Sequence, residues 1–501
     1  LAKVTVTETT SAVTLSVNPI VTAALSFTPR HLLVRTNVLA TTGTPNFRIR
    51  LNSDSGSNYN IQVLDAAGSS ASTLRETADH FGLPTNVTSD ANEFCSGSFL
   101  FPDALSTRTD KSVLAMSGRV EDFLRAGAGR WANTAAITSV TLYLDASTFT
   151  AGSTFELCVV DESFNVSETI LTGDSGSAGF AITGISGADG DLVCIGNLRS
   201  DRSGNADSIR TRLNGDTTET NYYTQRFIGY ASTTAAESQN LSQNAACTAS
   251  TAEANNFGAY LCQVTNFADG SNDRISNCLH GFHEGTAPRS QVGFDTTRWD
   301  NTAAVTAVQV WCNDNDFVAN SMLSIYAVPK NLIERQELGS DTTTVTFSSI
   351  PDTYDHLELT AYARGNSAGV PSRALAISLN SDTTDSNYKT QVLYGQSTTI
   401  AAYAQDGRNL LSIPTATTTA NIFTATTHTF YNYAKTDRHK HFLSVGGYNA
   451  NTGMVSSRWT DTSAISTIAL TVNVADYLAG SVFTLRGISA DIAVATFIPE
   501  V

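Results

Sequence analysis

The sequence predicts an all-β protein made of three tandem homologous β-sandwich domains of a jelly-roll-like type. Two observations indicate repetition: a segment that begins with Arg-Trp occurs three times, and a segment that begins with Leu-Asn occurs upstream of each copy. The third observation indicates strands. Runs rich in Val, Ile and Thr alternate apolar and polar residues, and clusters of Asn, Asp, Gly, Ser and Thr separate them.

The Arg-Trp segment reads RWANTAAITSVTLYLDASTFTAG, RWDNTAAVTAVQVWCNDNDFVAN and RWTDTSAISTIALTVNVADYLAG. In every copy an aromatic residue follows the Trp after 18 residues. A recurring Trp offers a large apolar surface, so we expect it to anchor a core rather than to form a ligand platform. The adjacent Arg could stack on an aromatic ring or pair with a carboxylate of a neighbouring unit. This signature comprises Arg130, Trp131, Phe149, Arg298, Trp299, Phe317, Arg458, Trp459 and Tyr477.

The Leu-Asn segment reads LNSDSGSNYNIQ, LNGDTTETNYYTQ and LNSDTTDSNYKTQ, and its Leu precedes the matching Trp by 80, 86 and 80 residues. Asn and Asp side chains bond backbone amides in tight turns, and the Tyr is expected to begin the returning strand. A calcium loop is the alternative, but the DxDxDG spacing and the closing Glu are missing. This signature comprises Asn52, Asp54, Tyr59, Asn214, Asp216, Tyr222, Asn380, Asp382 and Tyr388, and Gln62, Gln225 and Gln391 follow the three tyrosines.

The order and spacing of the two signatures predict domains at residues 1–162, 163–330 and 331–501, here called units 1, 2 and 3. Their length exceeds that of solenoid repeats and suits independent domains, so we expect each unit to have its own core. A fainter match opens each unit, with HLLVRT at His31, DLVCIG at Asp191 and HLELTA at His356.

Two strands are predicted after each Trp. AITSVTLYLDA and AISTIALTVNVAD alternate as half-buried strands do, and STFELCVV, SMLSIYAV and SVFTLRGIS follow after a short turn. This succession predicts a hairpin that closes each unit. A two-sheet sandwich would protect the strand edges.

Composition argues against several classes of partner. The chain has 501 residues, a formal net charge of -16 and no basic run, which disfavours nucleic acid and anionic membranes. It contains neither a long apolar stretch nor the apolar block of a signal peptide. The seven cysteines form no CxxC pair and do not recur at matching positions, so we expect buried apolar residues of a protein made in a reducing cell.

Candidates for catalysis or metal binding are few. GDSGS at residues 173–177 is similar to the nucleophile segment of chymotrypsin-like proteases, but it lies in a linker without a matching His segment. The pairs His280 with His283 and His439 with His441 could each begin a metal site, but neither pair recurs. We therefore predict no catalytic residue, metal or cofactor.

The combination of LNGDTTETNYYTQ with RWTDTSAISTIALTVNVADYLAGSVFTLRGIS resembles a module of structural proteins of tailed bacteriophages, which occur in virions as head, head-fibre or tail components. The resemblance covers all three units. Unit 1 lacks one residue between Leu51 and Asn58, and Asn320 stands where the other units have Gly152 and Gly480. Such modules resemble jelly-roll folds that act as trimers, so the resemblance implies a pseudo-trimer of three fused copies.

The leading hypothesis is a non-enzymatic virion structural protein of a tailed phage, an auxiliary capsid protein that decorates or cements the head or forms the base of a head fibre. Its partner would be the major capsid protein, after synthesis in the host cytoplasm. The first alternative is a tail or receptor-binding component that contacts host glycans. The second is a polysaccharide-degrading enzyme, which would need paired carboxylates in a cleft.

Overall fold

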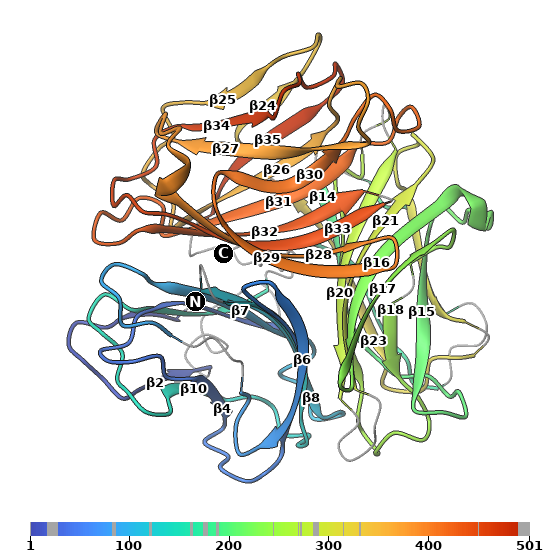
Figure 1. The fold of residues 1–501 in the computed structure, drawn as a ribbon. Helices are drawn as coiled ribbons and strands as arrows, with labels where there is room; N and C mark the ends of the chain where they lie inside the picture. The colour runs from blue at the N-terminus through green and yellow to red at the C-terminus, as the bar shows by residue number, and fades with distance from the viewer. Residues whose placement is uncertain are drawn as a thin grey trace.

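The computed structural model describes residues 2–17, 29–82, 87–119, 123–160, 164–173, 179–186, 190–243, 245–268, 270, 273–283, 290–313, 315–329, 332–448 and 450–488. Within these ranges the regular structure is β-strand, apart from short 3-10 turns such as η2 (Glu219–Asn221) and η3 (Asp385–Asn387). The predicted all-β class is confirmed, and the strands form several packed sheets (Figure 1).

The strands of unit 1 form two sheets. The eight-stranded sheet contains, in spatial order, β1 (Ala2–Thr5), β11 (Thr154–Val159), β3 (Leu32–Val38), β7 (Cys95–Phe101), β8 (Lys111–Arg119), β9 (Phe123–Trp131), β5 (Tyr59–Ala67) and β6 (Ser70–Ala78). The three-stranded sheet contains β2 (Ala12–Ser16), β10 (Ser139–Leu144) and β4 (Phe47–Leu51).

Unit 2 pairs an eight-stranded sheet with a four-stranded one. The larger sheet contains β12 (Asn165–Ile170), β23 (Met322–Pro329), β14 (Gly190–Leu198), β19 (Gly258–Val264), β20 (Arg274–Phe282), β21 (Gln291–Trp299), β16 (Tyr222–Tyr230) and β17 (Thr233–Gln239). The smaller sheet contains β13 (Phe180–Thr183), β22 (Ala307–Cys312), β15 (Ala206–Leu213) and β18 (Ala245–Thr248).

Unit 3 has the same two sheet sizes as unit 2. The larger sheet contains β24 (Leu332–Glu337), β35 (Val482–Ile488), β26 (His356–Ala363), β31 (Thr424–Tyr431), β32 (Lys440–Tyr448), β33 (Asn451–Trp459), β28 (Tyr388–Gln396) and β29 (Thr399–Asp406). The smaller sheet contains β25 (Thr344–Phe347), β34 (Ile468–Val472), β27 (Ser372–Leu379) and β30 (Asn409–Pro414). Counted along the chain, equivalent strands occupy the same places in all three larger sheets.

The predicted hairpin after each Trp is wrong. In unit 1, β10 pairs with β2 and β4 in the smaller sheet, whereas β11 pairs with β1 and β3 in the larger sheet. The loop between them therefore crosses from one sheet to the other. Burial explains the difference: β10 buries every second residue and has one partly exposed face, whereas β11 is buried on both faces.

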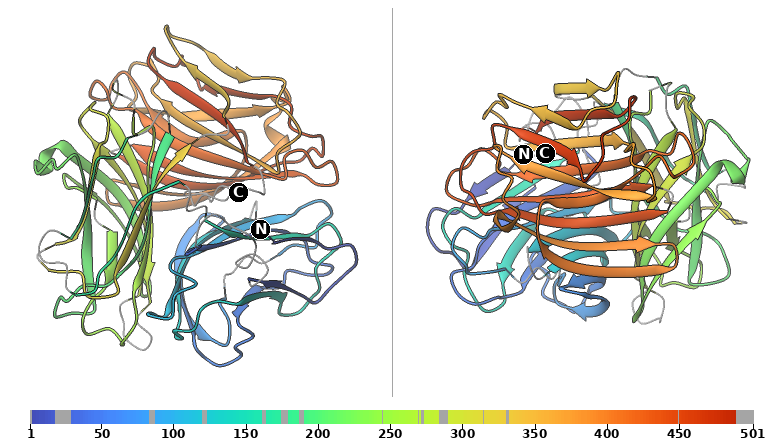
Figure 2. Two further views of the ribbon diagram at one scale, coloured as in Figure 1. Left: turned by 180° about the vertical axis from the view of Figure 1, so that it is seen from behind. Right: turned by 45° about the horizontal axis from the view of Figure 1, so that its top comes forward.

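The larger sheets lie between the smaller sheets and the centre of the molecule. Strands β14, β20 and β32 are buried along their whole length, so both faces of these sheets are covered. One face packs on the smaller sheet of the same unit, and the other turns toward the neighbouring units (Figures 1 and 2). The smaller sheets lie at the periphery (Figure 1).

The expectation that each unit keeps a separate core is wrong for unit 2. Units 1 and 3 each have a sandwich interior of their own, but the cluster that fills unit 2 continues into both neighbours. It includes Leu64 of unit 1, Phe227 of unit 2 and Leu393 of unit 3, all fully buried. The faces of the larger sheets that turn toward the neighbouring units thus carry apolar residues as well, and packing between the units removes these residues from water.

Candidate functional site: signature clusters and contacts between units

The two recurring signatures meet in space. In unit 3, the Trp459 indole Nε1 donates a 2.8 Å hydrogen bond to Oδ2 of Asp382. The same carboxylate accepts from Asn387 Nδ2 at 2.8 Å and from the backbone N–H of Thr384 at 2.9 Å. The contact recurs from Trp131 to Asp54 at 2.7 Å and from Trp299 to Asp216 at 2.8 Å.

The signature Tyr completes each cluster. The Tyr388 hydroxyl accepts the backbone N–H of Leu379 at 2.8 Å and donates to the carbonyl of Asp382 at 3.0 Å, and its ring stacks on Trp459. Burial raises the pKa of Tyr388, and likewise that of Tyr59 and Tyr222. These hydroxyls therefore stay neutral and form hydrogen bonds with backbone groups of the turn.

The signature Asn fixes the preceding turn in every unit. Asn380 adopts a left-handed φ of 50°, which Asn tolerates better than most residues. Its Oδ1 accepts the backbone N–H groups of Ser466 and Thr467, and its Nδ2 donates to the carbonyl of Ala464. Asn52 and Asn214 make the equivalent bonds with residues after Trp131 and Trp299.

The carboxylates of these clusters are used by N–H donors. Partial burial acts to raise the pKa of Asp54, Asp216 and Asp382, but hydrogen bonds from Asn and Trp outweigh it and hold the pKa below its ordinary value. Across the described residues, no group of three or more His, Cys, Asp or Glu side chains is placed to hold a metal ion. The clusters are thus built as turn anchors.

The aromatic residue 18 positions after each Trp lies in the loop that crosses between the sheets. Phe149, Phe317 and Tyr477 are fully buried. Phe149 meets Phe155 edge to face at a centroid distance of 4.8 Å, and Tyr477 meets Phe483 at 4.8 Å in the same way. These rings insert into the sandwich interior and anchor the crossing loop there.

The signature arginines link units as well as strands. Arg130 pairs with Asp110 of its own unit at 2.6 Å and with Glu253 of unit 2. Arg458 pairs with Glu93 of unit 1. Among the residues that the structure describes, the third arginine, Arg298, has its ion-pair partners within unit 2.

Arg298 pairs with Asp273 at 2.6 Å and with Asp300 at 2.8 Å, and its guanidinium lies 5.2 Å from the centroid of the Tyr223 ring. The contact between units 2 and 3 at this position is made by Tyr362 of unit 3, whose hydroxyl donates to the backbone carbonyl of Asp273 at 2.8 Å. The junction between units 2 and 3 therefore has a hydrogen bond between neutral groups, whereas the other two junctions have an ion pair.

The three Gln residues that follow the signature Tyr connect the units in one direction. Each Nε2 donates to the carbonyl of a residue in the hairpin turn of the next unit. The pairs are Gln62 to Ala231 at 3.1 Å, Gln225 to Ser397 at 3.1 Å and Gln391 to Gly68 at 2.9 Å. Every acceptor lies nine positions after the signature Tyr of its own unit and has a positive φ. The contacts run from unit 1 to 2, from 2 to 3 and from 3 to 1.

Two of these contacts are reciprocal. The backbone N–H of Gly68 donates to Gln391 Oε1 at 3.1 Å, and that of Ser397 donates to Gln225 Oε1 at 3.1 Å. At the first junction the N–H of Ala231 bonds instead to the carbonyl of Ser290. The side-chain amide thus replaces a backbone partner at two of the three turns.

A second set of contacts runs in the same direction, from the beginning of β3, β14 or β26, the third strand of each larger sheet, to the last strand of the next unit. The pairs are His31 Nε2 with Ser324 Oγ at 3.2 Å, Arg486 Nη2 with Asp191 Oδ2 at 2.8 Å, and His356 Nε2 with Glu156 Oε2 at 3.3 Å. All six side chains are buried. In each pair one residue, His31, Asp191 or His356, is the first residue of the faint third match in the sequence.

The remaining candidates from the sequence take structural places. His280 accepts the backbone N–H of Ala246 at 3.1 Å, and His283 accepts from Arg75 of unit 1 at 3.1 Å. Burial lowers the pKa of His283 and His441 to about 3, which keeps both neutral. The seven cysteines are buried free thiols, as expected. Of GDSGS, all but Gly173 lies outside the described residues.

One recurring group was missed in the sequence. Lys111, Arg274 and Lys440 lie directly opposite Trp131, Trp299 and Trp459 on the neighbouring strand. The Lys440 ammonium donates to the carbonyls of Arg438 and Thr462, and burial lowers the pKa of Lys111 and Lys440 to about 8. Because these residues precede the Trp by 20, 25 and 19 positions, unequal loop lengths hid the match.

Comparisons with known proteins define no family. No family model and no curated protein matches the chain. The 12:0-ACP thioesterase from Umbellularia californica is 8% identical with a TM-score of 0.08, over 48% of this chain and 74% of that one. The toluene transporter TodX of P. putida is 9% identical with a TM-score of 0.08, over 93% and 91%. Similarities this weak carry no argument about function. Among the described residues, no helix is long and apolar enough to span a membrane.

Proposed function

We propose that the chain is three homologous modules fused into a closed pseudo-trimer with a structural, non-enzymatic role. The module boundaries are those predicted at residues 1–162, 163–330 and 331–501. The equal strand order of the three larger sheets supports homology. The side-chain contacts that join the modules support closure.

The observation that most directly supports a closed ring is the direction of the Gln contacts. Equivalent donors and acceptors lie on different surfaces of each module, which is a heterologous arrangement. Heterologous contacts close into a ring when the rotation between modules brings the third back to the first. Gln391 of unit 3 reaches Gly68 of unit 1 and so completes the circuit. Fusion in one chain guarantees equal numbers of the three modules.

The role that fits this arrangement is that of an auxiliary capsid protein of a tailed phage, on the surface of the virion and bound to the major capsid protein. The resemblance of the two signatures to phage structural modules supports this role. The hydrogen bonds of Asp54, Asp216 and Asp382 also support this role, because their carboxylate oxygens accept hydrogen bonds that hold the fold together. A tail location is the alternative within the same class.

The ring is tested by cutting the chain. A protease recognition sequence is inserted between β23 and β24. Cleavage there breaks the covalent link between unit 3 and units 1 and 2 and leaves the residues of the contacts described above unchanged. We expect the two pieces to co-elute at the position of the uncut chain after cleavage, because unit 3 shares the central core. Separation of the pieces under native conditions would contradict the closed pseudo-trimer.

The virion role is tested by quantitative mass spectrometry of purified phage particles. The readout is the molar ratio of this chain to the major capsid protein. A ratio that corresponds to many copies per particle supports head decoration, and a ratio of a few copies assigns the protein to the tail or to a unique vertex. Absence from the particle would overturn the virion role and leave the ring intact as a separate conclusion.

A further inference from the structure

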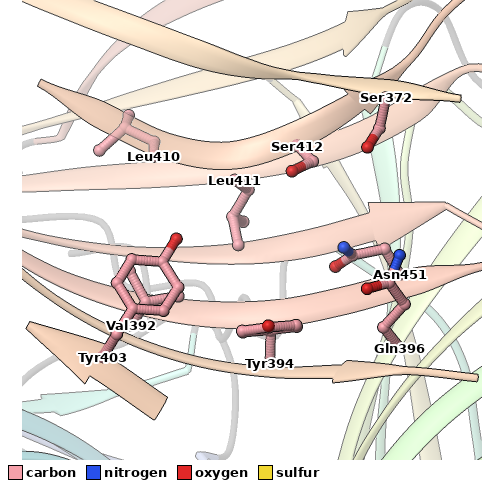
Figure 3. A pocket seen from close by; sticks show the side chains of 9 residues that line it. All are labelled: Ser372, Val392, Tyr394, Gln396, Tyr403, Leu410, Leu411, Ser412 and Asn451. Carbon is pink, nitrogen blue, oxygen red and sulfur yellow. The ribbon is translucent and has the colours of Figure 1, made fainter. Parts of the chain in front are cut away.

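Unit 3 contains a pocket that the proposed role does not use. It has a volume of about 200 Å³ and opens between β30 of the smaller sheet and β28, β29 and β33 of the larger sheet (Figure 3). Its lining is Ser372, Val392, Tyr394, Gln396, Tyr403, Leu410, Leu411, Ser412 and Asn451. The pocket is a place where the two sheets of this unit leave room between their side chains.

Two tyrosines dominate the wall. The rings of Tyr394 and Tyr403 lie 5.9 Å apart at an interplanar angle of 70°, so their faces point in different directions (Figure 3). Both side chains are only partly buried. Leu410 and Leu411 are buried and belong to β30, across the pocket from the tyrosines (Figure 3). The pocket therefore has an aromatic wall that faces an apolar one.

The other side of the pocket carries neutral polar groups. The carboxamides of Gln396 and Asn451 lie near one another (Figure 3), on residues that are directly opposite in the β28–β33 pair. Within the described part of the chain, neither carboxamide has a side-chain hydrogen bond, and the Tyr403 hydroxyl has none either. None of the described residues that line the pocket is charged. Donors and acceptors are thus available without a net charge.

We propose that this pocket binds a neutral pyranose ring of a glycan. The C–H face of a pyranose carries partial positive charge and packs on the negative face of an aromatic ring, whereas its hydroxyl groups both donate and accept, as carboxamides do. A few polar groups converging beside apolar walls are the usual composition of a small-molecule site. The net charge of -16 disfavours an acidic sugar.

The two tyrosines of the pocket occur in unit 3 and not at the equivalent positions of units 1 and 2. Counted from the signature Tyr, the positions of Tyr394 and Tyr403 are occupied by Asp65 and Leu74 in unit 1 and by Ile228 and Glu237 in unit 2. Asp65 forms an ion pair with Arg125 at 2.6 Å, and Glu237 forms one with Arg226 at 2.8 Å. Since equivalent modules fold without the two tyrosines, the fold itself does not require them.

The test uses the full chain and saturation-transfer-difference NMR with methyl α-D-glucopyranoside, methyl β-D-galactopyranoside, methyl α-D-mannopyranoside and N-acetylglucosamine as probes, and glucuronate as the charged counterpart. Tyr403→Ala removes one wall, and Gln396→Ala and Asn451→Ala remove the carboxamides at positions that do not support a core. Tyr230→Ala, in β16 of unit 2, is the matched control. Circular dichroism and the thermal midpoint verify folding.

We expect ring-proton signals from at least one neutral pyranoside, weaker signals from glucuronate, and affinity reduced about tenfold or more in Tyr403→Ala. The carboxamide variants should weaken binding as well, and Tyr230→Ala should leave it unchanged. Lack of a signal from all neutral probes overturns the proposal, as does unchanged binding in Gln396→Ala and Asn451→Ala. The outcome is independent of the virion role, because it is read on the isolated chain.

Discussion

Trp131 donates its indole N–H to the carboxylate of Asp54 across a sequence separation of 77 residues. The same bond occurs at Trp299 with Asp216 and at Trp459 with Asp382. Each bond fastens the last residue of a strand in the larger sheet to the turn that leads into the adjacent strand. The recurrence of the Trp and of the Asp therefore has a single cause, which is the folding of this corner.

Removal of the carboxylate should destabilise the protein. In Asp382→Ala, the buried Trp459 indole and the Asn387 amide lose their acceptor, at a cost of about 1–3 kcal/mol. Urea denaturation followed by tryptophan fluorescence measures the change. Asp385→Ala is the matched control, because Asp385 forms only an exposed ion pair with Arg408 and should cost less than about 1 kcal/mol. Equal losses in the two variants would contradict the anchoring role.

The Arg130 junction predicts an asymmetry between its two partners. Arg130→Ala leaves the buried Asp110 carboxylate without its cation, and burial already raises the pKa of that group, so the expected cost is about 3–5 kcal/mol. Glu253→Ala removes a half-exposed partner and should cost less than about 1 kcal/mol. Denaturant midpoints of the two variants give the comparison. A larger loss in Glu253→Ala than in Arg130→Ala would contradict this view of the junction.

Local pattern was sufficient to predict part of this architecture. The alternation in SVTLYL identifies β10, and the Leu-Asn and Arg-Trp signatures identify residues that touch, because both follow from short-range sequence order. The partner sheet of β11 was not predictable in this way, since a strand that is buried on both faces fits a hairpin and a crossing equally well.

Contacts between units depend on where distant surfaces meet. Gln62 and Gln391 recur in the sequence after the signature Tyr, but the residues near them in the sequence do not indicate that Ala231 and Gly68 are their acceptors. The pocket is hidden for the opposite reason. Tyr394 and Tyr403 do not recur, so a search for repetition passes over them.

Buried neutral histidines predict sensitivity to acid. Burial lowers the pKa of His31, His283, His428 and His441 to about 3. The unfolded chain binds protons at these residues below about pH 6.5, whereas the folded chain does not until about pH 3, so stability is complete above this window and falls as the pH decreases through it. The slope is at most about 1.4 kcal/mol per pH unit for each histidine.

A variant of one histidine tests this sign. His428 contacts the hydroxyls of Thr426 and Ser444. His428→Gln keeps a neutral polar side chain there and should flatten the dependence of unfolding free energy on pH by about one proton. Urea denaturation at several pH values between about 7 and about 4 gives the slope. Stability that rises on acidification in the unmodified chain would contradict the prediction.

The contact between Gln391 and Gly68 predicts a local change that separates the ring from general stability. The Gly68 N–H donates to Gln391 Oε1, so Gln391→Ala frees this amide and should speed its hydrogen–deuterium exchange about tenfold or more. The Ser397 N–H, which Gln225 holds in the same way, should not respond. Gln225→Ala should produce the reverse pattern, and each variant serves as the control for the other. If both amides accelerate together in either variant, the effect is global loosening, and the side chains do not act as separate links between neighbouring units.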